Sequence, residues 1–125
     1  MFAFENLDVY QRAVKFVGKI ERLTGSLRSQ IAYAVIDQLT RAALSVPLNI
    51  AEGNGRWHQN DKKKFFWIAR GSLFEIVPIL QVIKEKGACT TATNEELYGD
   101  LVIMAKMITN LIKAVDTLNH KAVPQ

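Results

Sequence analysis

Apolar residues recur at intervals of three and four through four long segments of this 125-residue chain, and this periodicity limits what it can fold into. Such spacing places the apolar side chains on one face of an α-helix, whereas a half-buried strand needs strict alternation. The sequence has no strand-like alternation of useful length, no low-complexity tract and no internal repeat. The pattern predicts four helices, over residues 6–24, 29–53, 61–87 and 94–119.

The fourth segment has the clearest pattern. Its apolar residues are spaced 4-3-4-3-4-3, a heptad seam typical of helices that pack at about twenty degrees, and they are Leu97, Leu101, Met104, Ile108, Leu111, Val115 and Leu118. The expected inner face of the first helix comprises Tyr10, Ala13, Val14, Val17, Ile20 and Leu23. That of the third comprises Phe65, Ile68, Ala69, Leu73, Ile76, Leu80 and Ile83.

Glycines and polar residues mark the expected helix ends. A glycine just beyond a helix tolerates the left-handed backbone that ends it, which predicts stops at Gly25, at residues 53–55 and at Gly87. Side-chain oxygens that accept hydrogen bonds from first-turn amides favour Asn60 or Asp61 as the third cap and Asn94 as the fourth. Pro47 and Pro78 lie inside predicted helices, where each is expected to bend the helix.

Length and composition predict one all-α domain over residues 1–125, folded as an antiparallel up-down-up-down four-helix bundle. With 49% hydrophobic residues the chain can bury a core without a metal or a disulfide. The lone Cys89 and an acidic N-terminal segment favour a cytoplasmic protein over a secreted one. We expect no membrane span, because charged residues interrupt the apolar stretches.

Several apolar residues fall outside the predicted inner faces. On the fourth helix these are Ile103, Met107 and Ala114, and on the first they are Val9 and Phe16. Large apolar side chains on the outer face of a bundle favour a subunit interface. The alternative is isolated surface apolar residues, which are common. The pattern therefore predicts a homo-oligomer that uses Ile103 and Met107.

The net charge of +4 originates in one segment. Residues 53–70 hold five of the 16 basic and one of the 12 acidic side chains, so the remaining eleven of each sign cancel. Cations attract phosphate without reading sequence, which makes Arg56, Lys62, Lys63, Lys64 and Arg70 the candidate nucleic-acid contacts. Positive charge at a helix N-terminus is unfavourable, which points to a role outside folding. The alternative is a solvated basic turn offset by Asp61.

Aromatic residues accompany these cations. Lys63, Trp67, Arg70 and Phe74 are spaced 4, 3 and 4 apart and share one helix face. Such a face is suited to stacking on bases or to anchoring another subunit. Trp57 lies in the preceding loop, where it adds a stacking surface or covers the end of the bundle.

A polar line follows the second helix at spacings of 4, 4, 3 and 4, through Arg41, Ser45, Asn49, Glu52 and Arg56. We interpret it as a structural hydrogen-bonded network across the Pro47 bend, with Arg41, Asn49 and Glu52 as its main members. In an oligomer the same line would face a neighbouring subunit or a central channel.

The sequence lacks the motifs of an enzyme. His58 and His120 have no carboxylate at ligand spacing, and no phosphate-binding loop, dinucleotide fingerprint or cysteine cluster occurs. We therefore predict no catalytic residue, no cofactor and no metal site.

Three stretches carry a family resemblance: residues 4–13, residues 38–56 with Ser45-Val-Pro-Leu-Asn-Ile-Ala-Glu-Gly53 at their centre, and Phe65 with residues 68–75. Over about residues 4–115 the chain resembles the 23S rRNA intervening-sequence protein family, also called four-helix bundle proteins. Pro78 departs from the family pattern, which puts the straightness of the third helix in doubt.

That family is similar to the accessory variability protein of diversity-generating retroelements, a barrel-shaped homopentamer that binds nucleic acid and a reverse transcriptase. The resemblance implies a ring of five subunits and a role with RNA or DNA, and it does not imply an enzyme. The leading hypothesis is a non-enzymatic nucleic-acid-associated protein. The alternative is an interaction or scaffold protein whose aromatic residues grip a polymerase or ribosomal partner. An enzyme using Glu52 and Arg41 is the remote third hypothesis.

Overall fold

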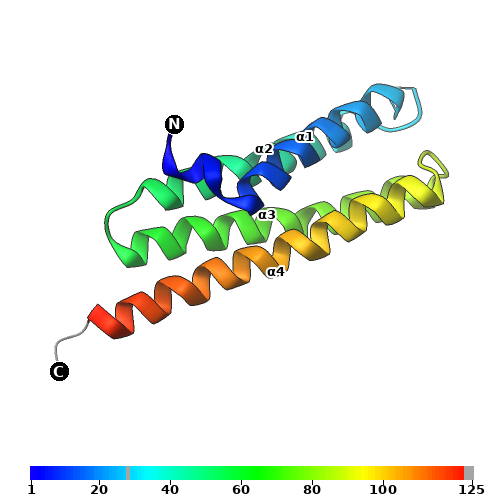
Figure 1. Cartoon of the computed structure of the whole chain (residues 1–125). Coiled ribbons are helices and arrows are strands. Elements are labelled where there is room, and N and C mark those ends of the chain that lie inside the picture. Colours follow the sequence, from blue (N-terminus) through cyan, green and yellow to red (C-terminus); the bar gives the residue numbers. More distant parts are fainter. Residues whose placement is uncertain (28, 123–125) are drawn as a thin grey trace.

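The computed structural model describes residues 1–27 and 29–122, with side chains described as far as residue 117. A short 3-10 turn, η1 (Ala3–Asn6), precedes four helices, which are α1 (Asp8–Leu27), α2 (Tyr33–Gly55), α3 (Gln59–Glu85) and α4 (Thr91–Ala122). Successive helices run in opposite directions, each packs on the next, and α1 also packs on α4 (Figure 1). The all-α bundle is therefore confirmed over the described part of the chain, and the final residues of the predicted 1–125 domain lie outside it.

Helices α3 and α4 both start before the predicted positions. Helix α4 begins at Thr91, before Asn94, and the Thr90 hydroxyl accepts a hydrogen bond from the backbone N–H of Thr93 at 3.1 Å. Helix α3 begins before Asn60 and Asp61, and His58 occupies its cap position without a side-chain cap bond. Neither predicted cap is correct.

The helix ends depend on packing as much as on glycine. Helix α1 continues past Gly25 to Leu27, whose side chain is fully buried. Gly87 does end α3, because its φ of +71° suits glycine. The Ala88 N–H donates to the Ile83 carbonyl at 3.3 Å and the Gly87 N–H to the Lys84 carbonyl at 2.9 Å. These two bonds form a Schellman motif, which pairs carbonyls that the helix end would leave free.

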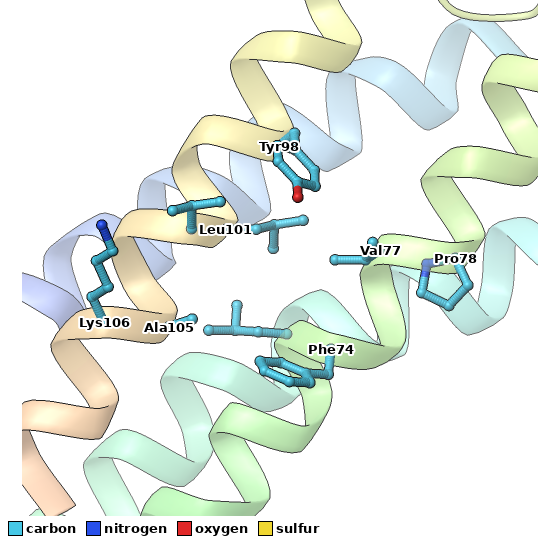
Figure 2. Close-up of a pocket in the computed structure, with 9 residues that line it drawn as sticks. Phe74, Val77, Pro78, Tyr98, Leu101, Ala105 and Lys106 are labelled. Carbon is cyan, nitrogen blue, oxygen red and sulfur yellow. The ribbon is translucent and has the colours of Figure 1, made fainter.

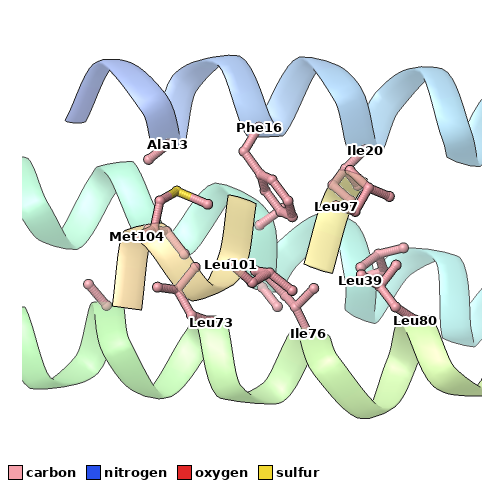
Figure 3. Close-up of a cluster of buried hydrophobic side chains, with 14 of the residues drawn as sticks. Ala13, Phe16, Ile20, Leu39, Leu73, Ile76, Leu80, Leu97, Leu101 and Met104 are labelled. Carbon is pink, nitrogen blue, oxygen red and sulfur yellow. The ribbon is translucent and has the colours of Figure 1, made fainter. Parts of the chain in front are cut away.

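Side chains from all four helices meet in one apolar core (Figure 3). The α4 seam is nearly as predicted, although Ile112 is buried and Leu111 only partly so, and the Leu118 side chain lies outside the described residues. Helix α1 is rotated from its predicted orientation. Val9 and Phe16 are 3% and 2% exposed, whereas Val14 is 47% exposed. The predicted interface role of Val9 and Phe16 is wrong, because both face the core of their own subunit.

The inner face of α3 differs from the predicted one near the start of the helix. Phe66 is buried at 2% exposure, whereas the predicted Phe65 is only half-buried and Ile68 is 42% exposed. The remaining predicted members of its stripe are buried, namely Ala69, Leu73, Ile76, Leu80 and Ile83. The correction at the start of α3 matters for function, because it decides which neighbouring side chains reach solvent.

Gly53 allows α2 and α3 to approach closely. A Cβ atom at this position would lie 2.8 Å from the Phe66 ring and 3.1 Å from the Lys62 carbonyl oxygen. The helix ends at Gly55, within the predicted break at residues 53–55. Gly53 is therefore a packing residue, and the missing side chain makes room for the Phe66 ring.

Pro47 and Pro78 both lie inside helices that continue on either side. Proline at position 47 leaves the carbonyl of residue 43 without its usual partner. The Asn49 amide donates across this proline to the Ser45 carbonyl at 2.8 Å and to the Ser45 hydroxyl at 2.9 Å. The Ser72 hydroxyl donates to the Ser45 hydroxyl at 2.9 Å and so links α3 to α2.

Lys19 connects α1 to α4 through two carboxylates. Its ammonium lies 2.8 Å from Asp100 and 3.0 Å from Glu96. The hydrogen bond to Asp100, followed by that to Glu96, raises the pKa of Lys19 above its ordinary value of 10.5. Because the folded pKa is the higher one, this stabilisation is complete below pH 10.5 and is lost as the pH rises through the raised pKa.

Helix α3 has a hydrophobic window of 18 residues with mean hydropathy 1.5, long and apolar enough to cross a membrane by length and composition. We expected no such window, because charged residues interrupt the apolar stretches of the sequence. Helix α3 meets the criterion although its window contains Glu75. A core helix passes the same test. Here the buried side of the window supplies Leu73, Ile76 and Leu80 to the bundle core, so packing accounts for that part of its apolar character.

Two glycine substitutions test the close approach of α2 and α3. Gly53→Ala should destabilise the protein by about 1–3 kcal/mol, because the added methyl group overpacks the Phe66 ring. Gly71→Ala is the matched control, since a Cβ there meets nothing within 4 Å. It should stabilise the exposed middle of α3 by about 0.5–1 kcal/mol. Urea unfolding measures both, and equal shifts of the same sign would contradict the packing role of Gly53.

Candidate nucleic-acid interface

The predicted basic segment surrounds the short connection between α2 and α3. Arg56 caps the C-terminal end of α2, and Lys62, Lys63 and Lys64 occupy the first turns of α3. Trp57 lies in the connection with 89% of its surface exposed. This connection is at the same end of the bundle as the N-terminus (Figure 1).

Two of the five predicted cations are paired with acids. The Arg56 guanidinium forms an ion pair with Glu52, one helical turn earlier, and lies 4.7 Å from the centroid of the Phe65 ring. The Lys63 ammonium donates to Asp116 of α4 at 2.7 Å. Both charges are therefore partly neutralised, and the Lys63 pair fastens α3 to α4.

Lys62 has a structural partner that its position in the sequence does not reveal. Its ammonium donates to the backbone carbonyl of Asn54 at 2.7 Å. That carbonyl belongs to the last turn of α2, where the helix dipole favours a positive charge. The positive charge of Lys62 is unfavourable near the N-terminus of α3, but its ammonium group lies at the C-terminal end of α2, where the charge is favourable. Lys64 differs, because it is exposed and has no carboxylate within 4 Å among the described residues.

Arg70 lies beside two exposed aromatic rings. Its guanidinium carbon is 4.3 Å from the Phe74 ring centroid and 5.5 Å from that of Trp67, and its Nε donates to the Thr109 hydroxyl at 3.0 Å. Trp67 and Phe74 are 52% and 53% exposed. The predicted face of α3 is thus assembled, and it presents a cation between two aromatic rings.

Two further cations from α4 join Arg70. Lys106 and Lys113 line with it a depression of about 240 Å³, whose polar lining is completed by Thr109 and Asn110. None of these three cations has a carboxylate partner within 4 Å in the described part of the chain. We call Arg70, Lys106 and Lys113 the cationic groove. The two lysines were missed because charge was counted along the sequence, although the spacing of residues 106, 109, 110 and 113 places them on one helix face.

An apolar pocket of about 440 Å³ adjoins the cationic groove between α3 and α4. Phe74 of α3 and Tyr98 of α4 lie on opposite sides of it (Figure 2), and each is about half exposed. Ala105 and Lys106 line both the pocket and the groove, so the two are adjacent.

Comparisons with known proteins agree with this fold. The profile of the 23S rRNA-intervening sequence protein family matches residues 5–110. The chain belongs to this family. The crystal structure of a protein of unknown function from the S23 ribosomal protein family of Bacteroides thetaiotaomicron is similar, with a TM-score of 0.79 and 22% identity. The match covers 84% of this chain and 98% of that one, and it shows the shared fold. No curated protein matches the chain.

The polar line of α2 lies within the matched region. Its side chains form separate hydrogen-bonded pairs. Arg41 bonds to Asp37 at 2.9 Å, Asn49 bonds to Ser45, and Glu52 bonds to Arg56. The predicted single network of Arg41, Asn49 and Glu52 is therefore wrong, because the partners lie one turn away along the helix. The Ser45–Asn49 pair reaches α3 through Ser72, and the Glu52–Arg56 pair reaches α3 through the Phe65 ring.

The two residues predicted to form a subunit interface have different surroundings. Ile103 is 42% exposed, whereas Met107 is partly buried against the core. Neither lines the apolar pocket. In the described part of the chain no three His, Cys, Asp or Glu side chains gather closely enough to hold a metal ion. Cys89 is partly buried, and desolvation raises the pKa of its thiol, which disfavours the reactive thiolate.

Substitutions of Lys62 and Lys64 test whether the bond of Lys62 to Asn54 stabilises the fold. Lys62→Met keeps the aliphatic stem but removes the bond to Asn54, and it should destabilise the fold by about 1 kcal/mol. Lys64→Met is the matched control and should stay within about 0.5 kcal/mol of the parent protein. Thermal or urea unfolding measures the difference. Equal stability of the two variants would show that the Lys62 bond contributes nothing.

Proposed function

We propose that this protein is a non-enzymatic, cytoplasmic nucleic-acid-associated protein that contacts RNA or DNA phosphates through α3 and α4. The observation that carries this proposal is the cationic groove, where three positive side chains surround one depression without a carboxylate partner in the described residues. A polyanion neutralises such a cluster and gains entropy by releasing its counterions. The family name, which refers to an intervening sequence of 23S rRNA, is in keeping with an RNA-associated role.

The five predicted phosphate contacts do not support the proposal equally. Arg56, Lys62 and Lys63 have partners within the fold, so they serve the proposal less well than the sequence suggested. Lys64 and Arg70 keep their proposed role, and Lys106 and Lys113 join them. Trp67 and Phe74 border the same face and supply stacking surfaces for bases.

We also propose that the protein is a homo-oligomer, with five subunits as the number implied by the family resemblance. The half-exposed Ile103 supports a contact between subunits. A ring would repeat the cationic groove around its axis, so that weak phosphate contacts on one nucleic acid reinforce one another through effective concentration.

The second candidate function is a scaffold for a polymerase or ribosomal partner. The exposed aromatic residues Trp67, Phe74 and Tyr98 favour it, since aromatic side chains are common anchors in protein interfaces. The two functions differ in their response to salt. Phosphate binding weakens steeply as salt increases, whereas an apolar anchor does not.

Charge reversal in the groove tests the proposed function. Lys106→Glu with Lys113→Glu should weaken binding of labelled RNA and DNA at least about tenfold. It should also make the salt dependence shallower, by about 0.7 in slope for each lost phosphate contact on a single strand. Fluorescence anisotropy over a salt series measures both effects.

The matched control carries the same change in charge at the far end of α3. Lys84→Glu with Lys86→Glu should leave binding nearly unchanged, because these exposed residues lie about 20 Å along the helix from Arg70. Equal losses in both double variants would indicate a response to net charge alone. Salt-insensitive capture of a purified protein partner, with no binding of RNA or DNA, would favour the scaffold function instead.

A single substitution tests the proposed assembly. Ile103→Glu should convert the oligomer to a 14.1-kDa monomer, because a buried carboxylate without a partner strongly opposes association. Val14→Glu is the control, since Val14 is similarly exposed but lies on α1. Light scattering after nuclease treatment gives the mass. A parent protein that is already monomeric would contradict the assembly.

A further inference from the structure

The apolar pocket between α3 and α4 has an aromatic ring from each helix in its lining. Phe74 and Tyr98 lie on opposite sides of it and are 53% and 51% exposed (Figure 2). The rest of the lining is mostly aliphatic and includes Val77, Val102 and Leu101. A volume of about 440 Å³ is within the range of small-ligand pockets.

The pocket lies next to the cationic groove. Lys106 lines both, and Arg70 lies 4.3 Å from the centroid of the Phe74 ring at the border between them. A ligand that fills both sites needs a flat apolar part joined to several negative charges. A purely apolar partner would cover the pocket but leave three cations without counter-charges.

We propose that the ligand is single-stranded nucleic acid, with one base held in the apolar pocket and the neighbouring phosphates on Arg70, Lys106 and Lys113. This inference rests on the proposed function and narrows it. Bases of a single strand expose faces that stack on aromatic side chains. In a duplex those faces are already stacked on each other, and freeing one costs unstacking energy.

The lining of the pocket also predicts how strongly the protein distinguishes one nucleotide base from another. Among the described residues that line the pocket, Tyr98 and Lys106 alone have a side chain with a hydrogen-bonding group. Base edges therefore find few partners inside, and discrimination among bases by hydrogen bonds is weak. Binding should depend on the presence of a base much more than on its identity.

Three probes of similar charge test the inference on the intact chain. They are an oligothymidylate of about 16 nucleotides, a hairpin that folds the same number of nucleotides into a duplex, and an abasic strand with the same backbone. Fluorescence anisotropy at about 0.05 M salt should show the base-bearing strand binding about tenfold tighter than either of the others.

Variants then assign this preference to the pocket. Phe74→Ala and Tyr98→Ala should each weaken binding of the base-bearing strand about five- to tenfold, with the salt dependence and abasic-strand binding unchanged. Lys106→Ala with Lys113→Ala should instead weaken all three probes and lower the salt dependence. Tyr33→Ala, which removes a 79% exposed aromatic ring at the start of α2, is the control and should change nothing.

The outcomes separate this inference from the proposed function. Equal binding of all three probes would overturn the base pocket and leave phosphate binding standing. Loss of the oligomer in Tyr98→Ala, seen as a fall in mass by light scattering, would overturn it as well, because a second copy of the chain would then cover the pocket. If none of the three probes bound, both the base pocket and the proposed phosphate binding would be overturned.

Discussion

The close approach of α2 and α3 at Gly53 sets the orientation of the surface on which function is proposed. Because Gly53 has no side chain, the Phe66 ring packs where a Cβ atom would lie only 2.8 Å away. Phe66 is thereby fixed in the core, and each following residue is placed by the rotation of about 100° per residue along the helix. Trp67 and Phe74 consequently reach solvent, and Arg70 lies half-buried between them.

The sequence predicted the bundle and its connectivity but not the rotation of every helix. Helix α4 has one strong heptad seam, so its inner face was nearly correct. Helices α1 and α3 each offer two competing apolar stripes, as with Phe65 and Phe66. Periodicity cannot choose between adjacent stripes of similar strength. The choice depends on contacts with another helix, and at Phe66 the decisive contact is with a glycine thirteen positions earlier in the chain.

The candidate site shows a similar division. Local sequence located the aromatic and basic side chains of α3, because their spacing along one helix is enough to place them together. It could not give their partners. Lys63 meets Asp116 from α4, and Lys62 reaches the carbonyl of Asn54 across the connection. Both contacts arise from the antiparallel packing of helices, which a count of charges along the chain does not contain.

The cations of this region have two different roles, one in the stability of the fold and one in the proposed binding. Those nearest the α2–α3 connection are held by Glu52, Asn54 and Asp116, and they stabilise the fold where the helix ends meet. Three cations without carboxylate partners in the described residues, Arg70, Lys106 and Lys113, line the groove farther along α3 and α4, beside exposed rings and an apolar pocket. A phosphate placed at the connection would compete with acids already in position. At the groove it would meet no such competitor, and its neighbouring base would lie next to aromatic surface. Electrostatics and apolar burial therefore favour the same part of the molecule for binding nucleic acid, and that part differs from the segment with the highest charge density in the sequence.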